Sequence, residues 1–324
     1  MNASHGPTKD DAATPIRYLQ VDVFAERAGG GNPLGVVFGT DAWSGADMQR
    51  FAAWTNLVET TFVLAPNDTH ASYRLRIFTP SKEIPFAGHP TIGSAHAALE
   101  IGRVVPRDGG LIQECGAGLL PIRVEGEDAQ QRLYVQAPAA RVLRAGADDP
   151  LLRAVLGDTP LGALPPAFVE GGRRWWVAEF ADEASLRTWK PDHAAILALA
   201  RAGDSLGLCA FARAATQRTS PSAGRDESQP YDLVVRAFPA GVGIVEDPAS
   251  GAANGLIAAY IAQREPQGSL ARGYRVSQGR EMGHDATIEV RIDAREGGEA
   301  AVWVGGRSHT IIDGVLKCRI GAAA

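Results

Sequence analysis

The chain has 324 residues, of which 45% are hydrophobic and 21% are charged. This composition is ordinary for a globular protein and excludes disorder of the whole chain. The formal net charge of -5 lacks the basic character of a general nucleic-acid binder, so we expect no nucleic-acid partner. No stretch approaches the roughly 18 apolar residues of a membrane span, so we expect no membrane association. At roughly 100–200 residues per domain, the length indicates about two domains.

Residues 1–15 are polar and lack the apolar centre of a secretory signal peptide, which predicts a flexible leader. The three cysteines, Cys115, Cys209 and Cys318, are scattered and form no Cys-x-x-Cys motif. This pattern argues against a disulfide framework and against a structural zinc site. We therefore expect a cytoplasmic protein that holds no metal.

The first half of the chain predicts short strands and two helices. Alternating apolar or β-branched residues indicate strands at 17–24, 34–38, 59–64, 73–78 and 111–124. Ser44 is the expected cap of the first helix, because Asp47 three residues later completes a capping box. The second helix is expected at 90–101, with Pro90 at its first position and Gly102 after its end.

The second half predicts the same alternation. Strands are expected at 133–136, 175–179, 233–238, 287–292, 301–304 and 311–320, and helices at 184–200, interrupted at Pro191, and at 250–263. The polar run 125–131 is the expected boundary between a first domain, 16–126, and a second, 127–308. The last strand, 309–320, is a candidate to complete the first domain. Residues 216–230 have the composition of an exposed loop.

Two segments form a weak internal repeat. Residues 83–95 and 246–255 each run from an acidic loop into a helix rich in Gly and Ala. A helix N-terminus carries unpaired N–H groups and a partial positive charge, and small residues let a ligand approach the backbone. Two such ends facing each other would bind a small anion. The alternative is that each segment is an ordinary helix start.

Three ionisable residues interrupt apolar segments. Glu59 stands at a helix-to-strand junction, where it is either an exposed edge residue or a partly buried acid with a raised pKa. His89 is expected at an exposed loop tip before a helix, where a capping role is the alternative to catalysis. Asp247 precedes a proline and has an alternative reading as a turn initiator.

A set of motifs resembles, in the same order along the chain, those of the phenazine biosynthesis protein (PhzF-like) family. They are Asp22-Val23-Phe24 with Gly31-Asn32-Pro33, the run Asn56-Leu57-Val58-Glu59-Thr60-Thr61-Phe62, the run from Arg76-Ile77-Phe78-Thr79-Pro80 to Glu83-Ile84-Pro85-Phe86-Ala87-Gly88-His89-Pro90-Thr91-Ile92-Gly93, then Glu246-Asp247-Pro248-Ala249-Ser250-Gly251-Ala252, and Gln278-Gly279. The chain is identified as a member of this family from these residues.

The resemblance implies the diaminopimelate-epimerase-like fold, an α/β (α+β) architecture. Two similar domains each wrap a mixed sheet around a central helix, and the active site lies in the cleft between them. The family's type reaction is the isomerisation of trans-2,3-dihydro-3-hydroxyanthranilate without a cofactor. A small carboxylate substrate and a homodimer are implied in the same way.

Residue roles follow from the same resemblance. Glu59 is implied to be the carboxylate that shuttles the proton, with His89 and Asp247 in supporting catalytic roles. A single carboxylate suffices when it is shielded from water, because it can hold the proton between removal and return. We expect desolvation to raise the pKa of Glu59.

Substrate binding is implied for the backbone around Gly251 and Ala252, with Asn32 and Gly88 as further residues lining the cleft. The family usually has a hydroxyl residue at the place of Ala252, and an Arg is common at the place of His284. These departures, with the long insert at 216–230, predict a substrate that differs from the phenazine precursor.

Two alternatives stay open at this stage. The first is an epimerase of an amino or hydroxy acid, and the second is a binding protein that keeps the fold without turnover. A racemase with two thiols is disfavoured, because the matching loops carry His89 and Ala252 rather than cysteine. Cys115 lies in a strand-like segment and is expected to be structural.

Overall fold

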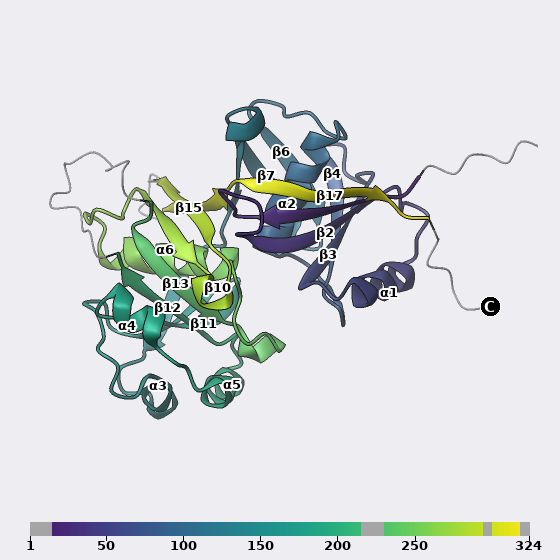
Figure 1. Ribbon diagram of the computed structural model, residues 1–324. Coiled ribbons are helices and arrows are strands. Elements are labelled where there is room, and N and C mark those ends of the chain that lie inside the picture. Colours follow the sequence, from purple (N-terminus) through teal and green to yellow (C-terminus); the bar gives the residue numbers. More distant parts are fainter. Residues whose placement is uncertain (1–14, 215–229, 294–299, 318–324) are drawn as a thin grey trace, which may run out of the picture.

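The computed structural model describes residues 15–214, 230–293 and 300–317. Two lobes lie side by side, one built mainly from the first half of the chain and the other from the second (Figure 1). A 17-stranded mixed sheet runs through both lobes in the described part of the chain. The lobes therefore share one continuous system of backbone hydrogen bonds.

In the residues that the structure describes, the first lobe contains two α-helices. Its elements are β1 (Arg17–Val23), β2 (Asn32–Phe38), α1 (Gly45–Thr55), β3 (Glu59–Leu64), β4 (Tyr73–Phe78), β5 (Glu83–Ile84), α2 (Gly88–Glu100), β6 (Gly110–Cys115) and β7 (Gly118–Glu125). The predicted strands of this half are confirmed. The capping box is also confirmed, because Ser44 accepts from the N–H of Asp47 and Asp47 accepts from the N–H of Ser44.

The described part of the second lobe adds four α-helices, and its last strand returns to the first lobe. Its elements are β8 (Arg132–Gln136), β9 (Arg141–Ala145), α3 (Pro150–Leu156), β10 (Ala167–Gly171), β11 (Arg173–Glu179), α4 (Glu183–Thr188), α5 (His193–Ala202), β12 (Leu208–Arg213), β13 (Leu233–Phe238), α6 (Gly251–Arg264), β14 (Gly273–Gln278), β15 (Ala286–Asp293), β16 (Ala301–Gly306) and β17 (Ser308–Val315). The helix expected at 184–200 is two helices, α4 and α5, which end and begin on either side of Pro191.

Each lobe wraps its strands around one central helix. In the first lobe α2 packs against β1, β2 and β3, and in the second α6 packs against β10, β15 and β16. Glycines permit the close approach: a β-carbon on Gly93 of α2 would lie 2.6 Å from Leu34 Cδ2, and one on Gly255 of α6 would lie 2.6 Å from Ala137 Cβ. The two repeated segments thus lead into structurally equivalent helices.

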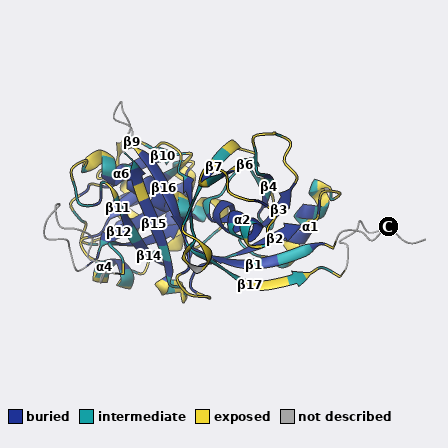
Figure 2. Cartoon of the chain, turned by 90° about the horizontal axis from the view of Figure 1, so that it is seen from above, coloured by how far each residue is buried: buried dark blue, intermediate teal, exposed yellow. Residues whose placement is uncertain are grey.

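Two strands link the lobes. β8 pairs with β7 of the first lobe and with β16 of the second. β17 pairs antiparallel with β1 and lies along the outside of the first lobe, where it is largely exposed (Figure 2). The last strand was expected at 311–320, but it begins at Ser308 and ends at Val315, and residues 318–320 lie outside the described residues. A domain boundary near residue 126 stays a prediction.

Two expectations about α2 are wrong. The helix begins at Gly88 rather than at Pro90, because a proline is accepted anywhere in the first turn, where its missing N–H has no helical acceptor. His89 is not at an exposed tip: it is 6% exposed, since the start of α2 is packed between the lobes. Within the described residues, no helix is both long and apolar enough to cross a membrane.

Candidate active site

The residues predicted to be catalytic come together where the two lobes meet. Asn32 and Glu59 are the first residues of β2 and β3, which pair in parallel and therefore begin at the same edge of the sheet. His89 is the second residue of α2, and Asp247 lies in the loop that leads to α6. The cluster thus draws three side chains from one lobe and one from the other.

Asn32 joins the two lobes through its amide nitrogen. This nitrogen donates to Oδ1 of Asp247 at 2.9 Å and to the carbonyl of Ala249 at 3.0 Å. Both partners are acceptors, which fixes which end of the amide is the NH₂ group. Asn32 is completely buried, and its nitrogen also lies 3.4 Å from Nδ1 of His89.

Glu59 and His89 form a buried pair. Oε2 of Glu59 lies 3.3 Å from Nε2 of His89, and the two side chains are 10% and 7% exposed. The sequence left open whether Glu59 is exposed, and the structure buries it. Among the described residues, no hydrogen-bond partner is aligned with Glu59 Oε2, His89 Nε2 or Asn32 Oδ1. These three buried polar atoms therefore have unused hydrogen-bonding capacity.

Burial sets the protonation of this pair. Desolvation, with a smaller contribution from the charge of Asp247, raises the pKa of Glu59 to about 8. Desolvation lowers the pKa of His89 to about 3. Between these two pKa values the pair carries one titratable proton. The low polarity of the site favours placing it on Glu59, as a neutral acid beside a neutral imidazole.

Asp247 is shaped by its own loop. Its pKa is raised by desolvation, and hydrogen bonds from the N–H of Ala249 and from Asn32 oppose this effect. The Asp247 carboxyl thus lies close enough to Glu59 for its charge to act on that acid, and it accepts from Asn32 of the other lobe. A second acid near Glu59 makes simultaneous ionisation of both costly.

The starts of α2 and α6 touch. A β-carbon built on Gly88 would lie 3.3 Å from Cα of Gly251, and one on Gly251 would lie 3.4 Å from Cα of Gly88. The two helix ends therefore face each other, as the repeat suggested, and the space between Gly88 and Gly251 is too narrow for a side chain on either. Ser250 caps α6 by accepting from the N–H of Ala253 at 3.4 Å, and Ala252 is exposed in the first turn.

Sequence reasoning missed the role of Gln278. Its Nε2 donates to the carbonyl of Asp247 at 2.8 Å, and its Oε1 accepts from Asn254 at 2.9 Å and from the N–H of Ser250 at 3.3 Å. This 1% exposed side chain therefore ties the Asp247 loop to the first turn of α6. The Gln278-Gly279 motif was the available signal.

His284 lies beside the loop that carries Asn32. Its Nδ1 is 2.7 Å from the carbonyl of Gly31, so Nδ1 carries the proton and donates. The next residue, Asp285, donates its N–H to the carbonyl of Gly30 at 2.7 Å. His284 thus links the lobes. The insert at 216–230 lies almost wholly outside the described residues.

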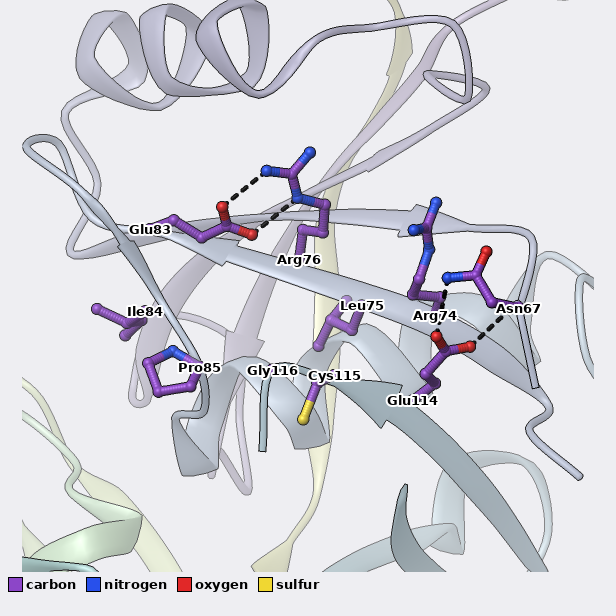
Figure 3. A pocket seen from close by; sticks show the side chains of 10 residues that line it. All are labelled: Asn67, Arg74, Leu75, Arg76, Glu83, Ile84, Pro85, Glu114, Cys115 and Gly116. Carbon is purple, nitrogen blue, oxygen red and sulfur yellow. Dashed lines mark hydrogen bonds and ion pairs between the residues drawn. The ribbon is translucent and has the colours of Figure 1, made fainter. Parts of the chain in front are cut away.

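A separate surface pocket of about 410 Å³ lies along β4, between β5 and the turn after β6 (Figure 3). None of the predicted site residues lines it. Its charges oppose one another: Arg76 forms a bidentate pair with Glu83, and the charge of Arg74 acts on Glu114, which also accepts from Asn67. The thiol of Cys115 lies in this pocket, away from the Glu59 cluster. In the described part of the chain, no group of three or more His, Cys, Asp or Glu is arranged to hold a metal.

The central helices of the two lobes meet end to end beside a buried acid–imidazole pair. This arrangement is that of the diaminopimelate-epimerase-like fold. Solved structures agree. A PhzF-family phenazine biosynthesis protein of Bacillus anthracis superposes with a TM-score of 0.76 at 22% identity, covering 94% of this chain and all of that one. A hydroxyproline epimerase of Agrobacterium vitis superposes with a TM-score of 0.57 at 15% identity, covering 94% of each chain.

The sequence profile of the phenazine biosynthesis-like protein family (PhzC-PhzF) matches residues 21–314, and the chain belongs to this family. It is 33% identical over 309 residues to antisense-enhancing sequence 1 of Schizosaccharomyces pombe, covering 93% of this chain and 98% of that protein. It is 32% identical over 301 residues to the trans-2,3-dihydro-3-hydroxyanthranilate isomerase of Pseudomonas aeruginosa, covering 92% and 98%. The chain is an isomerase of this family.

Proposed function

We propose that this isomerase works without a cofactor and that Glu59 carries a proton from one carbon of a small carboxylate substrate to another. The observation that carries the proposal is the buried Glu59–His89 pair, whose facing atoms lie 3.3 Å apart. A carboxyl group with a pKa of about 8 is close to neutrality, where a group can both accept and return a proton.

The reaction needs no net change in protons. The ionised carboxylate of Glu59 takes a proton from a carbon that conjugation makes acidic, and the electron pair moves into the π-system. The same carboxyl then returns the proton to another carbon of that system. The neutral His89 and the amide of Asn32 orient the substrate, and the charge of Asp247 adds to desolvation in raising the pKa of Glu59.

The substrate carboxylate is assigned to the start of α6. Backbone N–H groups in the first turn of a helix attract an anion; Gly251 and Ala252 form this turn, and Ala252 is exposed. Similarity to the isomerase of Pseudomonas aeruginosa supports trans-2,3-dihydro-3-hydroxyanthranilate or a related carboxylate as the substrate. Ala252 lacks the hydroxyl found in the family motif, which supports a relative with a different polar group near the carboxylate.

The test is incubation of the protein with trans-2,3-dihydro-3-hydroxyanthranilate in deuterated buffer, beside Glu59→Gln and the exposed control Glu127→Gln. The parent and the control are expected to consume the compound and to place deuterium on carbon, whereas Glu59→Gln is expected to lose about 100- to 10,000-fold in rate. Equal rates in the parent and Glu59→Gln contradict the role of Glu59. Deuterium at the α-carbon of an amino acid, without movement of a double bond, supports an epimerase instead.

We also propose that the protein acts in the cytoplasm as a homodimer. The free thiols of Cys115 and Cys209 support a reducing compartment. The exposed strand β17, which pairs with β1 on one side and carries the exposed Ile311 and Ile312, supports pairing with a second copy. A monomeric mass by light scattering at micromolar concentration would refute the dimer.

A further inference from the structure

Arg236 is a charged side chain inside the second lobe. It lies on β13 and is 5% exposed. Its neighbours on the same face of the strand, Val234 and Phe238, belong to the apolar cluster beneath α4 and α5. A guanidinium in such a place is costly unless its donors all find acceptors.

Every nitrogen of the Arg236 guanidinium has an acceptor. Nε and Nη2 donate to the two carboxylate oxygens of Glu246, each at 2.9 Å. Nη1 donates to the carbonyls of Leu186 and Trp189, at 3.2 and 2.7 Å, where α4 ends. Only the planar fork of an arginine can make these four contacts together, because lysine is a single point charge.

The partner of Arg236 stands next to the acid in the site. Glu246 directly precedes Asp247, and Ala237 directly follows Arg236. The N–H of Asp247 donates to the carbonyl of Ala237 at 2.9 Å. Two adjacent contacts, one between side chains and one between backbones, therefore close the loop 239–246 back onto β13. Asp247 is the first residue beyond this closure, and its Oδ1 accepts from Asn32 in the other lobe.

We propose that Arg236 is a positioning residue, which acts through Glu246 to hold Asp247 at the place where it meets Asn32. The proposal rests on the supporting role of Asp247 in the proposed function. A buried ion pair adds little stability compared with apolar residues of similar size, so its value here lies in fixing one loop conformation. The charge of Glu246 also acts on Asp247, and Arg236 neutralises it at close range.

The test replaces the pair by apolar residues of similar size, as Arg236→Met with Glu246→Leu. The matched control is Arg213→Met with Glu179→Leu, which removes a second ion pair of the same lobe, with a buried Glu179 and a partly buried Arg213, and with Arg213 Nε 2.7 Å from Glu179 Oε1. With trans-2,3-dihydro-3-hydroxyanthranilate as the probe, the first variant is expected to lose about 100-fold in kcat, with KM changed less than about threefold. The control is expected to keep the parental kcat. Arg236→Lys is expected to fall between the parent and the double variant.

A crystal structure of the Arg236→Met, Glu246→Leu variant gives a readout that does not need turnover. Asp247 Oδ1 is expected beyond hydrogen-bond distance of Asn32 Nδ2, from 2.9 Å in the parent. An unmoved Asp247, or a parental kcat, overturns the proposal. If the double variant does not fold, kcat and the crystal structure of Glu246→Gln are measured instead. If the parent does not convert the probe, the proposed function fails, and the crystal structure alone decides the positioning.

Discussion

Gly88, at the start of α2, faces Gly251, at the start of α6, so closely that a side chain on either would press on the other's backbone, although the two belong to different lobes. A β-carbon on either residue would come within 3.4 Å of the other residue's backbone. Backbone cannot move aside as a flexible side chain can, so this contact sets how closely the two helix ends approach. His89 directly follows Gly88, and the loop that carries Asp247 leads into Gly251, so a displacement at either glycine is passed to the site.

Gly88→Ala is therefore expected to push the two helix starts apart. We expect a loss of about 1–3 kcal/mol in the free energy of unfolding from overpacking. We also expect a loss of about 100-fold in kcat, because small displacements of reacting groups are costly. Urea unfolding and steady-state kinetics measure the two effects. Gly314→Ala, on the edge strand with no atom within 4 Å of the added carbon, is the control and should behave as the parent.

Glu59 predicts how stability depends on pH. Its pKa is raised to about 8 in the folded protein, whereas the unfolded chain has the ordinary value of 4.5. Between these values the folded state keeps a proton that the unfolded state releases, so the free energy of unfolding falls as the pH rises, by about 3–5 kcal/mol in total. Glu59→Gln has no such proton. Its stability relative to the parent should increase from pH 5 to pH 8, and a constant difference in urea unfolding would contradict the raised pKa.

The rate of isomerisation should depend on the same ionisation. If the ionised carboxylate of Glu59 removes the proton, kcat/KM rises with pH and levels off above about pH 8. Below that value the rise should approach tenfold per pH unit. A profile that is flat from pH 6 to pH 9 would show that Glu59 is not the base, or that its carboxylate is not buried in solution.

Asn32→Asp tests the bridge between the lobes. The introduced oxygen would face two acceptors, the carboxyl of Asp247 and the carbonyl of Ala249, where the parent has a donor. We expect about 100-fold loss in kcat/KM and a loss of stability of about 1–3 kcal/mol that grows with pH, as the new carboxyl ionises. Asn32→Ala only removes the donor and should lose less stability at pH 8. The reverse order would contradict the assigned orientation of the amide.

Ala252→Ser restores a hydroxyl at the exposed first turn of α6. One additional hydrogen bond to the substrate carboxylate, worth about 0.5–1.5 kcal/mol, should lower KM by about 2- to 10-fold. The matched control is Ala194→Ser, which adds the same group to the exposed first turn of α5. An unchanged KM in Ala252→Ser would place the carboxylate elsewhere in the site.

Sequence patterns predicted the structure reliably where residues close together in the chain decide it. The capping box of Ser44 and Asp47 and the alternating strand β4 formed as predicted. β12 was missed because all but one of its residues are buried, so it has no alternating pattern. β9 was missed because it is mostly exposed and its two large apolar residues, Val142 and Leu143, are adjacent rather than alternating with polar ones.

The sequence by itself determined the family, the type of most elements and the identity of the acids and the histidine in the cluster. Only the tertiary structure decided that Glu59 and His89 are buried, that Asn32 bonds Asp247, and that Arg236 and Gln278 hold the Asp247 loop. The reason is physical. The pKa and the orientation of a side chain depend on what excludes water from it, and here the excluding residues come from distant segments that meet only when the two lobes fold together.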